Sequence, residues 1–277
     1  MRYNALQYVP WPSFGAWYIC APAALDQGYP IMWLWFSKLG SPKWFYELSG
    51  RWLPWLVTAM FAFLFVGVVW ALLFVPQDYQ QGLTNRIFYV HVPVASISLA
   101  FFPLIAIAGT ITLVWKMKLA DIVVKTAAPL GAWFTAFALA SGSIWGIDTW
   151  GTWWIWDGRL TSLLFQFFLL IGVVSLRSAL EDSDAAAKAC ALLSIVGCIN
   201  VVVIKYSVDW WNTLHQPGTD FVLSSNKANG PDIWVPLVLM IGAVYLFFAV
   251  SMIMSTRNEI LQRERRSQWV EELIDNL

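Results

Sequence analysis

Residues 145–162 read WGIDTWGTWWIWDGRLTS and lie between two long apolar stretches, which identify the flanking chain as membrane spans. Five of the first twelve residues are Trp, and Asp157 and Arg159 close the run. Because Gly residues and Asp148 interrupt it, this aromatic segment is not itself a span. An indole offers a wide flat face and one N–H donor. Gly lets the backbone come close to a ligand, so the aromatic segment is interpreted as a compact platform for a large planar apolar ligand.

A second interpretation of the aromatic segment stays open. Trp residues collect where a bilayer meets water, and such an aromatic belt explains one or two Trp residues at each helix end. A belt does not explain five of them packed between two spans. From composition alone, the ligand platform and the interfacial belt remain alternatives.

The composition is that of a membrane protein. Hydrophobic residues make up 59% of the 277 residues and charged residues 12%, whereas soluble domains carry about 25% charged residues. The net charge is zero, and the absence of a basic face argues against nucleic-acid binding. The chain has no Walker-type phosphate-binding motif, so any ATP hydrolysis is assigned to a partner and no catalytic residue is predicted.

The sequence predicts an all-α integral membrane protein. A span needs about 20 apolar residues, and six segments meet this requirement: 52–75, 87–115, 126–147, 160–176, 185–204 and 233–256. Three domains follow: an extension over 1–50, a six-helix membrane domain over 51–256, and a carboxyl-terminal tail over 257–277. Pro10, Pro12, Pro22 and Pro30 break the extension, which we expect to lie on the membrane surface.

The distribution of Lys and Arg predicts the orientation of the spans. Both tails, the second-to-third connection and the fourth-to-fifth connection hold most of these residues, and the opposite side holds four: Arg86, Arg159, Lys205 and Lys227. Cytoplasmic loops carry the excess of Lys and Arg. We therefore expect both termini in the cytoplasm and the aromatic segment in the periplasm of a bacterial inner membrane.

The aromatic segment resembles the WWD signature of haem-handling membrane proteins, and most specifically that of the CcmC family of bacterial cytochrome c maturation. The resemblance rests on an ungapped run, WGTWWIWD-x-RLTS, and covers roughly residues 45–255. It implies delivery of haem, bound as b-type cargo, to a periplasmic haem chaperone. It also implies three further partners: an ABC-type ATPase, its membrane subunit and a small single-span subunit.

The resemblance also assigns site residues. The chain has only two His residues, His91 near the start of the second span and His215 between the fifth and sixth spans, and both fall on the predicted periplasmic side. They match the haem ligands of the family, and neutral imidazole is a good axial ligand for haem iron. No other metal ligand is predicted. The residues expected to contact the macrocycle or its propionates are Trp145, Trp150, Trp153, Trp154, Trp156, Asp157, Arg86 and Arg159.

Structural alternatives exist for each of these residues. A His in a membrane helix is often an interhelical hydrogen-bonding group, and His215 fits an ordinary polar loop position. Arg86 and Arg159 fit the role of headgroup anchors at helix ends. Asp157 also fits an N-cap of the fourth span, because it precedes the apolar run by the right margin.

Two other functions compete with haem delivery. A membrane b-type cytochrome would transfer electrons, but it usually holds haem between His residues inside the bilayer. A scaffold or permease subunit without haem would use the Trp residues for docking. The sequence leaves four matters open: whether haem crosses the bilayer through this chain, its redox state during transfer, the stoichiometry of the complex, and the role of residues 1–50. The three Cys residues form no C-x-x-C motif, which argues against thiol exchange and structural zinc.

Overall fold

The computed structural model describes residue 38 and residues 40–215 and 230–275. Its described part contains α-helices, one short 3₁₀-helix and loops, and it holds no strand beyond an isolated bridge between Asp78 and Gly82. The elements are α3 (Pro42–Leu73), η3 (Leu83–Ile87), α4 (Phe88–Trp115), α5 (Lys118–Trp150), α6 (Gly158–Ala179), α7 (Ser183–Trp210), α8 (Pro231–Arg263) and α9 (Gln268–Asp275).

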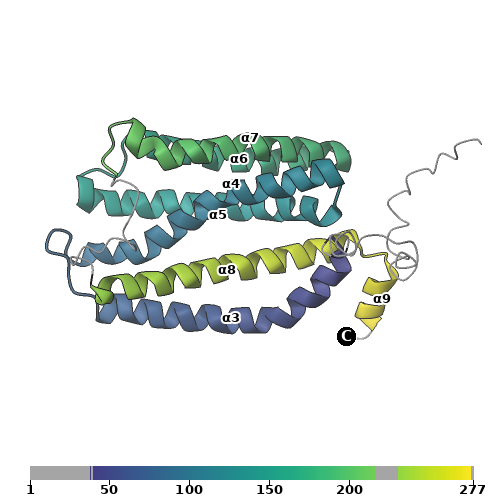
Figure 1. Ribbon diagram of the computed structural model, residues 1–277, viewed down its shortest axis with the longest axis horizontal. Helices are drawn as coiled ribbons and strands as arrows, with labels where there is room; N and C mark the ends of the chain where they lie inside the picture. Colours follow the sequence, from purple (N-terminus) through teal and green to yellow (C-terminus); the bar gives the residue numbers. More distant parts are fainter. Residues whose placement is uncertain (1–37, 39, 216–229, 276–277) are drawn as a thin grey trace, which may run out of the picture.

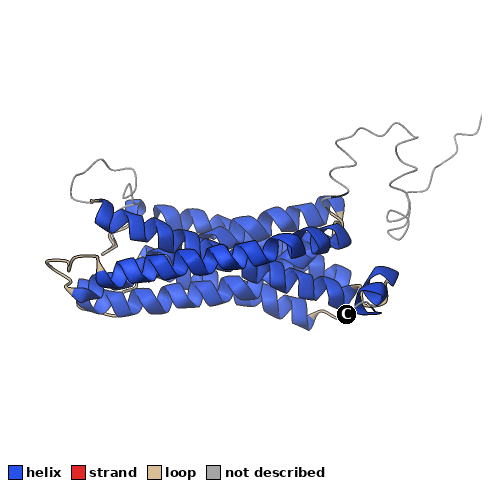
Figure 2. Cartoon of the chain, turned by 90° about the horizontal axis from the view of Figure 1, so that it is seen from below, coloured by secondary structure: helices blue, strands red, loops and turns tan. Residues whose placement is uncertain are grey.

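Six of these helices, α3 to α8, are long and apolar enough to cross a membrane. This confirms the predicted fold class and the number of spans. The helices run side by side along one direction (Figures 1 and 2). Helices α3 and α8 form a pair beside the four helices α4 to α7 (Figure 1). The start of α3, the end of α8 and α9 lie at one end of the bundle (Figure 1).

Local sequence explains where several helices begin. The Ser41 hydroxyl accepts from the Trp44 N–H at the start of α3, and an Asp182 carboxylate oxygen accepts from the Asp184 N–H at the start of α7. Asp157 caps α6, because its Oδ1 accepts from the Leu160 N–H at 2.7 Å. The predicted N-cap role of Asp157 is therefore confirmed. Such caps satisfy N–H groups that the first turn leaves without partners.

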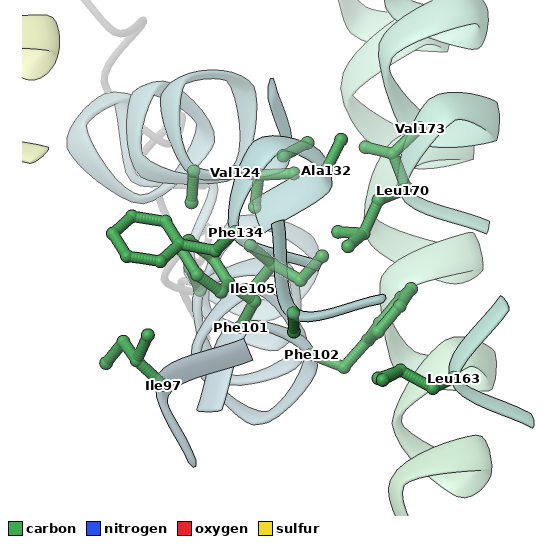
Figure 3. Packing of buried hydrophobic residues seen from close by; sticks show 14 of the residues in the cluster. Ile97, Phe101, Phe102, Ile105, Val124, Ala132, Phe134, Leu163, Leu170 and Val173 are labelled. Carbon is green, nitrogen blue, oxygen red and sulfur yellow. The ribbon is translucent and has the colours of Figure 1, made fainter. Parts of the chain in front are cut away.

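The core lies among α4, α5, α6 and α7. Phe101, Phe102, Ile105 and Leu170 are almost completely buried there (Figure 3). Gly197 on α7 lets the Phe102 ring approach so closely that a Cβ at position 197 would overlap the ring. The outer faces of the helices carry many exposed apolar residues, as expected for helices surrounded by lipid.

An ion-pair network joins α5, α6 and α8 near the end of the bundle where α8 finishes. Arg177 donates two hydrogen bonds to the Asp121 carboxylate, at 2.7 and 2.6 Å, and Arg263 donates a third at 2.7 Å. Lys125 and Arg263 both donate to Glu259 Oε1 at 2.6 Å. Asp121 and Glu259 are buried, so these contacts are shielded from water.

Most helix boundaries differ from the predicted ones, and two of the differences concern the aromatic segment and the amino-terminal extension. The third span was predicted to end at residue 147, whereas α5 continues to Trp150. Gly146 does not end the helix, because a helical Gly costs only about 1 kcal/mol. The helix ends at Gly151, whose positive φ of 74° suits Gly. At the amino-terminal side, α3 begins at Pro42, inside the segment that was assigned to the extension.

Candidate functional site

The predicted site residues lie at the end of the bundle opposite α9 (Figure 1). They come from η3, the start of α4, the end of α5, the loop 151–157, the start of α6 and the segment after α7. Short contacts tie these parts together. Thr84 in η3 donates to Asp148 Oδ2 at 2.7 Å, and Trp145 Nε1 donates to Gln81 Oε1 at 2.9 Å. The loop before η3 is therefore fastened to the end of α5.

His91 is the fourth residue of α4 and faces α5. Its Nδ1 lies 3.0 Å from Ser141 Oγ, and its ring centroid lies 5.6 Å from that of Trp145. The ring packs directly on Gly142, where a Cβ would come within 2.8 Å of His91 Cε1. The absence of a side chain at position 142 therefore makes room for the imidazole between the two helices.

His215 lies in the segment after α7 and contacts the loop before α6. Its Nδ1 is 3.0 Å from Asp157 Oδ2, and its backbone N–H donates to the Thr213 hydroxyl at 3.1 Å. The Thr213 hydroxyl itself donates to Asp157 Oδ2. The His215 ring centroid lies 4.5 Å from that of Trp150, with the planes tilted by 59°. Asp157 thus caps α6 with one oxygen and holds His215 with the other.

Electrostatics around His215 favour a neutral imidazole beside an ionised carboxylate. Burial lowers the pKa of His215; contact with Asp157 opposes this effect, and the nearby Arg159 cation adds to it. For Asp157, burial acts to raise the pKa, but hydrogen bonds from Thr213, Leu160 and His215 outweigh it and lower the pKa overall. A neutral imidazole keeps a lone pair that can bind a metal.

The five Trp residues of the aromatic segment divide into two groups. Trp145 and Trp150, in the last turns of α5, contact His91 and His215 respectively. Trp153, Trp154 and Trp156 lie in the loop and contact one another, and the planes of Trp154 and Trp156 meet at 77°. The loop rings therefore do not form one continuous flat surface. Trp153 and Trp156 are 64% and 76% exposed.

Two N–H groups at the site are buried without an acceptor within the described residues: Trp154 Nε1 and Arg159 Nε. Arg159 stands in the first turn of α6, where Asp157 and Asp209 are its nearby acidic groups. Arg86 is half-buried in η3. Buried donors normally have hydrogen-bond partners. An acidic ligand bound at this end would accept from the two N–H groups that the described residues leave without an acceptor.

The structure therefore brings five of the predicted residues into two clusters, each of which includes a Trp from the last turns of α5. His91 and Trp145 form the first, and His215, Trp150 and Asp157 form the second. Ser141, Gly142 and Thr213 were not predicted as site residues from the sequence. Ser141 could have been found, because it precedes Trp145 by one helical turn and so shares its face.

Comparison with known proteins extends the similarity over most of the chain. The family described as "Heme exporter protein C" matches residues 35–271. Heme exporter protein C of Escherichia coli K12 is 44% identical over 243 residues, which cover 88% of this chain and 98% of the relative. The Bradyrhizobium diazoefficiens protein of the same name is 44% identical over 229 residues, covering 83% and 86%. That of Haemophilus influenzae is 38% identical over 246 residues, covering 89% and 100%.

Proposed function

Because the chain belongs to the heme exporter protein C family, we propose that it binds haem at the periplasmic face of the inner membrane and delivers it to a periplasmic haem chaperone during biogenesis of c-type cytochromes. One observation carries the proposal. The only two His residues of the chain lie at the same end of the bundle, each against a Trp of α5. Relatives named as haem exporters give independent support.

In this proposal His91 and His215 bind the iron from opposite faces of the porphyrin. Two imidazoles alone do not complete the coordination of a free transition-metal ion. Haem iron already has four porphyrin nitrogens as ligands, so two imidazoles can fill its two axial positions. Trp145 and Trp150 lie beside the two rings and would pack against the macrocycle. The haem is non-covalently held cargo of the b type, and the protein supplies ligation and geometry.

The cationic and N–H groups of the site would bind the haem propionates. Arg159 carries a buried Nε–H without an acceptor within the described chain, as does the indole of Trp154. Arg86 adds a second cation at the same end. A guanidinium binds a carboxylate through two parallel hydrogen bonds. The exposed Trp153 and Trp156 would contact the haem edge or the approaching chaperone.

The distribution of Lys and Arg supports the proposed orientation in the membrane. The proposed partners are those implied by the family. The side away from the histidines carries most of these residues, which is typical of the cytoplasmic side. Both termini would then lie in the cytoplasm. An ABC-type ATPase with its membrane subunit would supply energy for release of the loaded chaperone, and a small single-span subunit would complete the complex.

The first test replaces each proposed iron ligand. We expect His91→Gly and His215→Gly to lose the low-spin Soret spectrum of the purified full chain, because each removes one axial nitrogen. Loading of the chaperone should fall by at least about tenfold, the scale of effects seen even for groups that only support a metal ligand. The measurements are absorption spectra of oxidised and reduced protein and covalent haem on the chaperone.

Lys188→Ala is the control for this experiment, because Lys188 is exposed near the start of α7, at the opposite end of the bundle. It should keep both the spectrum and the loading. If either His variant keeps both, the ligand assignment is wrong. Rapid reduction of the bound haem by quinol, without loading of any chaperone, would favour the electron-transfer alternative instead.

A further inference from the structure

The hydrogen bonds of Ser141 determine which nitrogen of His91 carries a proton. Ser141 Oγ lies 2.7 Å from the Phe137 carbonyl oxygen, which can only accept, so the hydroxyl donates to it. The same Oγ lies 3.0 Å from His91 Nδ1 and has only lone pairs left to offer. His91 Nδ1 must then be the donor. The neutral imidazole keeps its lone pair on Nε2.

A different acceptor gives His215 the same tautomer. Asp157 Oδ2 lies 3.0 Å from His215 Nδ1, and a carboxylate accepts but does not donate. The two other groups that touch this carboxylate, the Leu160 N–H and the Thr213 hydroxyl, are both donors to it. His215 Nδ1 is therefore also protonated, and its Nε2 carries the lone pair.

We propose that Ser141 and Asp157 are positioning residues that present both imidazoles to haem iron through Nε2, but make the two axial bonds unequal, so that His91 is the ligand released first. The inference rests on the proposed function. The hydroxyl that holds His91 is neutral, whereas the carboxylate that holds His215 is anionic. An anionic acceptor on Nδ1–H makes the imidazole a stronger donor to its metal.

Release requires no change in oxidation state. The iron–Nε2 bond of His91 breaks, the lone pair returns to the imidazole, and the His91 Nδ1–H continues to donate to Ser141 Oγ. The iron is left five-coordinate, held by His215, with one face open toward an incoming ligand. Because His91 sits in a helix and His215 in the segment beyond α7, this order opens the face of haem that lies toward α4.

Carbon monoxide bound to the ferrous haem complex tests this order. It displaces the weaker axial ligand, and its C–O stretching frequency then reports the ligand on the other side of the iron. Asp157→Asn is the decisive variant, because Asn is also a good N-cap and still offers an oxygen to Nδ1–H, but has no charge. We expect Asp157→Asn to shift the C–O stretch and raise the reduction potential of the haem before CO addition. Ser141→Ala should leave the C–O stretch unchanged.

Ser141→Ala should instead speed CO binding by about tenfold, because His91 loses the group that orients it. Ser141→Thr restores the hydroxyl and should restore the parent rate. A shifted C–O stretch in Ser141→Ala but not in Asp157→Asn would show that His215 leaves first. A shift in both variants, or in neither, would also overturn the proposal.

The parent protein separates failure of this inference from failure of the proposed function. If the purified full chain shows a six-coordinate low-spin spectrum, the proposed haem site stands and the variants decide the ligand order. If the parent takes up haem without a low-spin spectrum, or takes up none, the proposed function fails first and the release order falls with it.

Discussion

The imidazole of His215 is surrounded by one anion, one cation and a largely apolar loop. Burial lowers its pKa below the ordinary 6.5, Asp157 acts in the opposite direction, and Arg159 lowers it further. Because the net effect is a lowered pKa, the neutral form persists below pH 6.5. The proposed iron ligand is therefore in its binding form throughout the neutral range.

This shift predicts the pH dependence of haem binding. Protons compete with iron for His215 only below its lowered pKa, so affinity should stay constant as the pH falls through 6.5 and decline at more acidic values. Asp157→Asn removes the group that raises the pKa of His215, so its acid limb should move to lower pH. Haem titrations over a pH series measure both effects. A decline centred at 6.5 or above in the parent would contradict the prediction.

At the level of residues, the sequence predicted what depends on neighbours along the chain. Asp157 was expected as an N-cap because it immediately precedes the apolar run, and the structure confirms this role. Its bond to His215 joins residues 58 positions apart. The contact of Ser141 with His91 spans 50 positions. Such contacts depend on how α4, α5 and α7 pack, which a local pattern does not contain.

At the level of elements, the sequence pattern did not predict where α5 ends. The third span was predicted to end at residue 147, just past Gly146, yet the helix continues to Trp150. Gly146 serves the packing of this end. A Cβ at position 146 would come within 3.0 Å of the Trp150 ring and of the Thr152 carbonyl oxygen. Gly146 therefore lets the chain after α5 fold back over the last turn.

The contact between α4 and α5 at Gly142 gives a second prediction. Gly142→Ala would place a Cβ 2.8 Å from His91 Cε1, which is closer than real Cβ atoms approach. The imidazole must move while Ser141 still holds its Nδ1. Overpacking of this kind costs about 1–3 kcal/mol, and we expect haem affinity to fall by about tenfold. Haem titration and thermal unfolding in detergent measure the two effects.

Gly172→Ala is a matched control for Gly142→Ala. It makes the same change on α6, where the added Cβ would meet only Leu193 Cδ2, at an ordinary 3.4 Å. This variant should keep the haem affinity of the parent. Equal affinities for both variants and the parent would show that the position of His91 against Gly142 is unimportant for binding.

At the level of the whole molecule, hydropathy predicted six spans and the structure confirms that number. The family resemblance drawn from the aromatic segment is likewise confirmed by the match over residues 35–271. The pairing of α3 with α8 was not predicted, because both are apolar around most of their surface and lipid accepts either face. The ion-pair network was not predicted either, since Asp121 and Arg263 are 142 residues apart.

That network predicts a large effect of one substitution on stability. Asp121→Asn removes the charge that Arg177 and Arg263 share in a shielded position. Breaking a buried ion pair costs about 3–5 kcal/mol, because the buried Arg177 would lose its charged partner, whereas Arg263 keeps Glu259. We expect a clear loss of thermal stability in detergent. The measurement is thermal unfolding of the purified protein without haem.

Glu47→Gln provides the comparison for Asp121→Asn. The Lys43–Glu47 pair lies on α3 with both side chains 52% exposed and 4.0 Å between the charged atoms. Exposed pairs contribute about 0–1 kcal/mol, so this variant should unfold with the parent. If Asp121→Asn also unfolds at the same temperature as the parent protein, the network does not stabilise the packing of α8 against α5 and α6.

Trp145 and Trp150 both lie in the last turns of α5, and each contacts a different imidazole. The spacing between the Trp145–His91 and Trp150–His215 contacts is therefore set by about one and a half turns of a single helix. A change in that spacing would therefore require unwinding of the last turns of α5.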